Sequence, residues 1–269
     1  MNLTSSFTKK LARETLLNKY FGSVVAAAAY VFVFIICYNT AAIASVFLGG
    51  IAAIIAFLLM FVFLIIPLTL GYVFWSVRLT FAGDNEPIQI FKYFSSARDY
   101  RRALSFSLPF TGTVCFSGFI LFVPCFFAGL ISSGKLFTIF KMPIPSWAPG
   151  FWVLTTVMYI LAIITFLLIM LKYYLAPFLM AANENMEPLE AMHLSKTISA
   201  GRKGDFLILV LSFIGYIIAC AFVIPMIFIF PYFAASYSVH CHFAVAAYNK
   251  SIDNMLKPDI PSFNADISF

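Results

Sequence analysis

Two histidines near the C-terminal end have the clearest potential for chemistry. His240 and His242 lie in the segment 206–249, which is 44 residues long and contains no Asp, Glu, Lys or Arg. An ionisable residue in a membrane segment is a candidate functional residue, because its burial in lipid is costly. On a helix, residues two apart point about 160° away from each other, so the pair cannot share a metal ion. For His242 two interpretations stay open: an interhelical hydrogen bond, or contact with a substrate or a proton.

Five basic residues near the ends of apolar segments could bind anionic groups: Arg101, Arg102, Lys172, Arg202 and Lys203. Near an anionic membrane, each basic residue contributes about 1 kcal/mol of attraction. We therefore expect these residues to contact membrane lipids, in particular anionic lipid phosphates, or an acidic protein partner. The alternative is that they only set the orientation of the chain, with Lys172 serving as an interface anchor.

The sequence contains no catalytic or cofactor motif. It lacks H-E-x-x-H, G-x-S-x-G and a P-loop, and its long uncharged segments contain no carboxylate. Five cysteines lie in apolar segments without a pair at metal-ligand spacing: Cys37, Cys115, Cys125, Cys220 and Cys241. The sequence therefore predicts no enzyme, no metal site and no bound cofactor.

The composition indicates the elements that must hold these residues. Apolar residues make up 62% of the 269 positions and charged residues only 10%. A soluble domain needs about a quarter of its residues charged, and the apolar residues here form long blocks without strand-like alternation. The fold class is therefore all-α, a polytopic helical membrane protein. The net charge of +6 lies beside membrane segments, so we expect no nucleic-acid partner.

We expect about six transmembrane helices in a single integral-membrane domain covering 1–269. The uncharged stretch 20–77 is too long for one crossing, and the polar run Tyr38-Asn39-Thr40 with Gly49-Gly50 predicts a turn within it. Pro225 and Pro231 divide the last uncharged stretch in the same way. The predicted spans are 20–38, 46–72, 104–130, 151–172, 206–229 and 231–248. The alternative for 231–248 is a re-entrant or surface segment.

The basic residues predict the orientation. Fifteen of the 17 Lys and Arg residues fall on one side of the six spans, and only Lys135 and Lys141 fall on the other. By the positive-inside rule both termini are cytoplasmic, and the external loops are 39–45 and 131–150. We expect residues 1–19 to form an amphipathic helix along the membrane surface and residues 249–269 to form a cytoplasmic tail. Trp75 is predicted to be an interface anchor.

Two cytoplasmic stretches resemble each other at an offset of 101 residues. Glu86-Pro87 corresponds to Glu187-Pro188, and Arg101-Arg102 corresponds to Arg202-Lys203. Each stretch, 87–102 and 188–203, is predicted to be an amphipathic helix in the headgroup layer that leads into a span. The pattern favours either a parallel internal repeat or a layout common to interfacial helices.

Several short motifs carry a resemblance to a known family. They are Lys172-Tyr173-Tyr174, Leu194-Ser195-Lys196, Gly201-Arg202-Lys203, Leu211-Ser212-Phe213-Ile214-Gly215-Tyr216 and Pro231-Tyr232, with Gly71…Phe74…Arg78 in the N-terminal half. Together they resemble the bacterial integral-membrane family known as domain of unknown function 975. Tyr216 replaces the Trp usual in that family, and the usual Pro-Gly before the Lys is absent. The resemblance implies a bacterial plasma membrane and no known activity.

Three functions remain open from the sequence. The first is a non-enzymatic membrane component that binds lipids or a membrane or cytoplasmic protein partner through its interfacial helices. The second is a carrier or permeation pathway for a small solute or lipid, with His242 and the segment between Pro225 and Pro231 near its site. The third is an interfacial lipid-modifying enzyme, for which the sequence names no residue.

Overall fold

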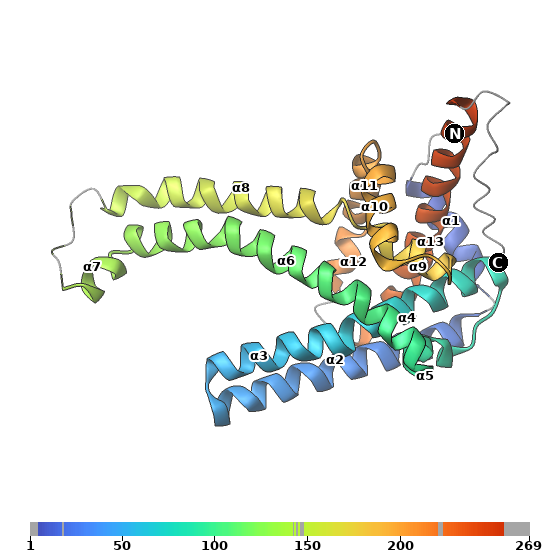
Figure 1. Cartoon of the computed structure of the whole chain (residues 1–269), viewed down its shortest axis with the longest axis horizontal. Helices are drawn as coiled ribbons and strands as arrows, with labels where there is room; N and C mark the ends of the chain where they lie inside the picture. Colours follow the sequence, from blue (N-terminus) through green and yellow to red (C-terminus); the bar gives the residue numbers. More distant parts are fainter. Residues whose placement is uncertain are drawn as a thin grey trace. The chain divides into compact units, whose positions relative to one another are not determined.

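The computed structural model describes residues 5–17, 19–141, 143, 145, 148–219 and 223–255 of the chain. All regular structure within these residues is helical (Figure 1). The chain divides into two compact units. One unit comprises residues 1–108 and 174–269, and the other comprises residues 109–173. The all-α prediction is confirmed for the described residues.

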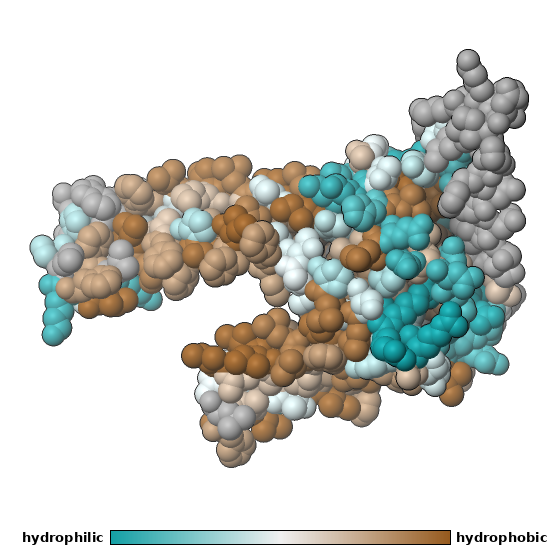
Figure 2. Space-filling model, in the orientation of Figure 1, coloured by the Kyte–Doolittle hydropathy of each residue, from teal (hydrophilic) through white to brown (hydrophobic). Residues whose placement is uncertain are grey.

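Four helical segments in the described part are long and apolar enough to cross a membrane. They cover Tyr20–Phe47, Gly50–Ala82, Ala97–Ser132 and Trp152–Met170. Large apolar side chains are exposed along all four, as expected of helices that face lipid. Figure 2 shows these hydrophobic residues over α2 (Tyr20–Leu48) and α3 (Gly50–Met60). Hydrophilic residues gather near α5 (Lys92–Ser95) and α9 (Ala176–Ala182) of the same unit. Predicted spans 206–229 and 231–248 are not among the four.

The first two spans form a hairpin with a later turn than the sequence predicts. Helix α2 (Tyr20–Leu48) meets α3 (Gly50–Met60) at Gly49, which has a φ of 88°. Asn39 and Thr40 lie inside α2, so the predicted loop 39–45 is wrong. Their side chains donate to the helix's own carbonyls, Asn39 Nδ2 to Ile35 at 2.8 Å and Thr40 Oγ1 to Ile36 at 2.9 Å. A polar run can therefore continue a helix in an apolar setting.

The second span contains a π-helical turn followed by a proline. Helix α3 passes through the π-helical segment η1 (Phe61–Ile65) into α4 (Ile66–Val77). Pro67 has no N–H to donate to the carbonyl of Phe63, its α-helical acceptor. The hydroxyl of Tyr100, from α6 (Ala97–Ser132), donates to that carbonyl at 3.0 Å. An acceptor that the proline leaves open thus gains a donor from another helix, as a membrane setting requires.

The chain then folds back across α4 in close contact. After the π-helical segment η2 (Arg78–Ala82), the 3₁₀ helix η3 (Pro87–Phe91) and α5 (Lys92–Ser95) pack on α4 and α2. A Cβ on Gly71 would lie 1.8 Å from the carbonyl oxygen of Ile90. Only glycine lets the two backbones approach this closely.

The core of this unit lies between α4 and the C-terminal helix α13 (Val223–Met255). Helix α1 (Ser5–Leu16) packs on α13 through a face that buries Thr8, Ala12 and Leu16. Trp75 is fully buried at the centre of the cluster, so its predicted role as an interface anchor is wrong. Small residues permit this packing: the Ser76 and Ser238 hydroxyls lie 2.8 Å apart between α4 and α13.

Pro231 does not separate two helices. Helix α13 continues through it, so the predicted boundary at 229–231 is wrong. Before α13 lie two short helices, α11 (Lys203–Leu211) and α12 (Ile214–Ala219). Proline blocks one backbone hydrogen bond, but a helix packed on both sides can tolerate that loss. Residues 234–241 of α13 are buried throughout.

The two stretches that suggest a repeat differ in local structure. Both begin with an extended Glu before a proline, at Glu86 and Glu187. The second continues as one α-helix, α10 (Pro188–Ser199), whereas the first is divided into η3 and α5 and ends at extended Ser96. The prediction of two matching helices over 87–102 and 188–203 is therefore wrong in its details.

The second unit is a helical hairpin. It contains the later part of α6, followed by α7 (Lys135–Ile139), a short 3₁₀ turn, η4 (Ala148–Phe151), and α8 (Trp152–Met170). Thr155 Oγ1 donates to the carbonyl of Ala128 at 3.3 Å, and the Phe122 and Phe166 rings meet edge to face with centroids 5.7 Å apart. Predicted spans 104–130 and 151–172 correspond to α6 and α8.

Candidate functional site: a polar network and groove beside α6

The predicted basic residues have different surroundings. Arg101 is exposed and Arg102 is half-buried, both near the start of α6. Arg202 and Lys203 are half-buried at the start of α11. Lys172 is half-buried in the second unit, after α8. Only Arg102 among them lines the polar groove described below.

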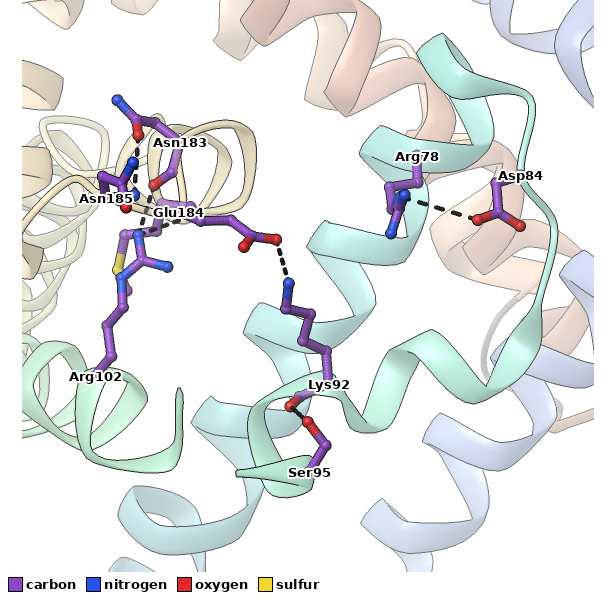
Figure 3. A network of polar contacts seen from close by, with 9 residues as sticks. Arg78, Asp84, Lys92, Ser95, Arg102, Asn183, Glu184 and Asn185 are labelled. Atoms are coloured by element: carbon purple, nitrogen blue, oxygen red, sulfur yellow. Dashed lines mark hydrogen bonds and ion pairs between the residues drawn. The ribbon is translucent and has the colours of Figure 1, made fainter. Parts of the chain in front are cut away.

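Arg102 binds the end of a neighbouring helix. Its guanidinium donates to the carbonyls of Met180 at 3.1 Å, Asn183 at 2.6 Å and Met186 at 3.1 Å. These carbonyls lie at and after the C-terminus of α9 (Ala176–Ala182), where a helix leaves acceptors without partners (Figure 3). A cation is also stabilised there by the helix dipole. Arg102 therefore positions the α9–α10 loop.

A second cation joins the same loop to the first half of the chain. Lys92 of α5 forms a hydrogen-bonded ion pair with Glu184 (Figure 3). This hydrogen bond holds the pKa of the Glu184 carboxyl below its usual value. The Lys92 ammonium also lies 4.4 Å from the centre of the Phe74 ring, within the range of a cation–π interaction. Residues 92 and 184 thus link α5, α4 and the α9–α10 loop.

Local hydrogen bonds hold the segment that carries Lys92. The Asn85 amide donates to the carbonyl of Lys19 at 2.7 Å, and Gln89 donates to Asp84. Asp84 also lies 3.9 Å from the guanidinium of Arg78. The family motif Gly71…Phe74…Arg78 therefore lies on the helix against which this segment folds.

The start of α6 is fixed by a serine. Ser96 is extended, and its hydroxyl accepts from the Asp99 N–H at 3.2 Å, as an N-cap does. This turn orients Arg98, Asp99 and Arg102 toward the α9–α10 loop.

Between these elements lies a groove of about 550 Å³, here called the polar groove. It is lined by Arg98, Asp99, Arg102, Ser105, Glu184, Asn185, Met186, Glu187, Pro188 and Leu189. Three carboxylates thus face two guanidiniums, one of which binds the α9–α10 carbonyls. Arg98 and Glu187 are exposed, and Asp99 is half-buried. Because Glu184 is paired with Lys92, Asp99 and Glu187 are the carboxylates of the groove that suit a ligand with basic groups.

The two histidines contact different aromatic groups. The His240 ring is buried near Phe206, with centroids 5.7 Å apart, and near Tyr174 at 6.1 Å. The His242 ring lies 4.6 Å from that of Phe81. Both belong to packed clusters and neither lines the polar groove.

The motifs of the C-terminal half contact one another across the first unit. The Ser195 hydroxyl accepts from the Leu175 N–H at 3.2 Å, and the Tyr174 carbonyl accepts from the Tyr237 hydroxyl at 2.5 Å. Phe213 packs against Tyr232, with ring centroids 5.2 Å apart. These residues hold α9, α10 and α12 against α13.

Several charged residues of the site were not predicted from the sequence, among them Lys92, Glu184 and Asp99. Their charges are visible in the sequence, but Lys92 and Glu184 are 92 residues apart. A charge inside a cytoplasmic loop gives no sign of its partner.

Comparison with known proteins identifies the family. Neither a curated protein nor a solved structure matches this chain. The family described as a protein of unknown function, DUF975, matches residues 1–243. That match covers the motifs, the polar groove and every described helix except the last part of α13, and the chain belongs to the DUF975 family.

Proposed function

We propose that this protein is a non-enzymatic component of the bacterial plasma membrane that binds a protein partner through the polar groove. The observation that carries the proposal is the groove itself, whose exposed charges lie beside the first turn of an apolar helix.

Charge selects the kind of partner. Three carboxylates line the groove, and one of its two arginines already binds the Met180, Asn183 and Met186 carbonyls. Glu184 is paired with Lys92, so a segment with Lys or Arg side chains complements the two remaining carboxylates, Asp99 and Glu187. The partner is therefore a basic segment of a membrane or cytoplasmic protein.

The proposed topology places the groove in the cytoplasm. Fifteen of the 17 basic residues fall on one side of the spans, together with both termini. The four long apolar helices supply the first four crossings. We propose that α11–α12 and the first half of α13 supply the fifth and sixth.

One premise of the carrier hypothesis is contradicted. It relied on a helix broken between Pro225 and Pro231, but α13 continues through Pro231. His242 packs against Phe81.

Site-directed photocrosslinking in membranes tests the proposal. A photoreactive amino acid replaces Leu189, which lines the groove and is 57% exposed. The matched control replaces Ile208, which is 56% exposed on α11 and does not line the groove. We expect one protein adduct of defined mass at position 189 and none at position 208. Identical adducts at both positions, or none at 189, would contradict partner binding in the groove.

A further inference from the structure

A second groove lies beside the N-terminal helix α1. It has a volume of about 280 Å³ and is formed by α1, the start of α2, α12 and α13. Its lining includes Arg13, Leu17, Tyr20, Tyr216, Phe228 and Tyr232. Apart from Arg13, every described residue that lines it is apolar or a tyrosine. We call it the Arg13 groove.

The charge of this groove is positive. Arg13 interacts with the Tyr232 hydroxyl at its edge. One helical turn earlier, Lys9 lies 4.2 Å from the centre of the Phe213 ring, which packs against Tyr216 and Tyr232. No carboxylate is among the described residues that line the groove. An anionic group beside Arg13 therefore meets attraction without a competing acid.

The apolar part of the groove continues onto a membrane span. Tyr20 begins the span Tyr20–Phe47, and its ring stacks on Phe228 with centroids 6.3 Å apart. The next residue, Phe21, is 85% exposed, and Leu17 in the groove is 70% exposed. Exposed apolar side chains at the start of a span face the lipid layer. The groove thus places the Arg13 guanidinium next to an apolar surface that faces the hydrocarbon of the bilayer.

We infer that the Arg13 groove binds an anionic phospholipid. The headgroup phosphate pairs with Arg13, and the start of one acyl chain lies along Leu17, Tyr20 and Phe228. A volume of about 280 Å³ is below the usual range of roughly 300–1,000 Å³ for enclosed ligands, so the rest of the chain lies in the bilayer. A free phosphate would leave the apolar lining uncovered. This site is separate from the polar groove and does not depend on the proposed partner.

Native mass spectrometry of the full chain with added phosphatidylglycerol or phosphatidylcholine tests the site. The change is Arg13→Gln, and the matched control is Lys10→Gln, which removes the same charge from an exposed residue of α1 outside the groove. We expect Arg13→Gln to weaken retention of one phosphatidylglycerol about fivefold, since one basic residue contributes about 1 kcal/mol. Lys10→Gln should leave retention unchanged, and phosphatidylcholine should bind weakly to all variants.

If Arg13→Gln and Lys10→Gln lose phosphatidylglycerol equally, the lipid responds only to the total positive charge of α1, and the inference is overturned. Unchanged retention in Arg13→Gln would also overturn it. Displacement of phosphatidylglycerol by an equal concentration of inorganic phosphate would also overturn it. If Arg13→Gln does not fold, Leu17→Glu provides the test, because that side chain is 70% exposed and its change places a carboxylate in the groove. It should lower phosphatidylglycerol retention; unchanged retention would contradict the site.

Discussion

Gly71 of α4 and Ile90 of η3 meet backbone to backbone: a Cβ on Gly71 would come within 1.8 Å of the Ile90 carbonyl oxygen. This contact holds the segment that carries Lys92 against α4, and it gives a physical reason for a glycine in the motif Gly71…Phe74…Arg78. The placement of Lys92 beside the α9–α10 loop therefore depends on Gly71, a residue that itself binds nothing.

Gly71→Ala is expected to destabilise the protein by about 3 kcal/mol or more, because the obstructing atom is backbone and cannot rotate away. Thermal unfolding in detergent measures the effect. Gly204→Ala, in α11 with open space around its Cα, is the matched control and should be neutral or stabilising. Equal behaviour of the two variants would show that η3 does not lie against α4.

Arg102 and Arg101 are adjacent but should differ in effect. Arg102→Gln leaves the Met180, Asn183 and Met186 carbonyls without their charged donor, which is expected to cost about 1–3 kcal/mol of stability. Arg101→Gln removes an equal charge from an exposed position and should change stability by less than about 0.5 kcal/mol. Denaturation of both variants under identical conditions compares them. Similar values would mean that Arg102 acts only as a charge.

Tyr100→Phe is expected to destabilise the junction of η1 and α4. It removes the donor to the Phe63 carbonyl, which Pro67 leaves without an α-helical partner, at a cost of about 0.5–1.5 kcal/mol because this hydrogen bond is exposed. Tyr38→Phe, at a 63% exposed position of α2, should have no effect. In a Pro67→Ala background, a backbone N–H can replace the hydroxyl, so the loss from Tyr100→Phe should shrink. A loss of the same size in both backgrounds would rule out this pairing.

The proposed six crossings can be tested with single-cysteine variants. Ser133→Cys should react with an impermeant thiol reagent from outside, and so should a variant whose only cysteine is Cys220. Ser251→Cys should not react until the membrane is opened. Labelling of Ser133→Cys alone, with Cys220 protected from outside, would reduce the crossings to the four long apolar helices.

The sequence predicts some levels of this structure better than others. The helical class and the first four apolar spans follow from long uncharged segments, because length and hydropathy are local properties. The turn at Gly49 was misplaced because Asn39 and Thr40 find acceptors in their own helix. Pro231 was misread because packing of α13 compensates for one lost hydrogen bond.

The candidate site was predicted only in part. Arg102 was identified from its charge, but a basic residue near a helix start has the same pattern whether it binds phosphate or a helix C-terminus. Its acceptors are 78 to 84 residues away in the chain. The pairing of Lys92 with Glu184 is equally remote, so neither contact leaves a local pattern that spacing could identify.

Partner binding in the polar groove is the central claim, and the yield of the crosslink from position 189 in charge variants tests it most directly. Glu187→Gln removes an exposed carboxylate that lines the groove, and Glu190→Gln removes one nearby on α10 that does not. The account predicts that Glu187→Gln lowers the adduct yield roughly tenfold, the loss of about one charge-assisted hydrogen bond, while Glu190→Gln leaves it unchanged. A yield that is the same in both variants would contradict recognition of a basic partner by this groove.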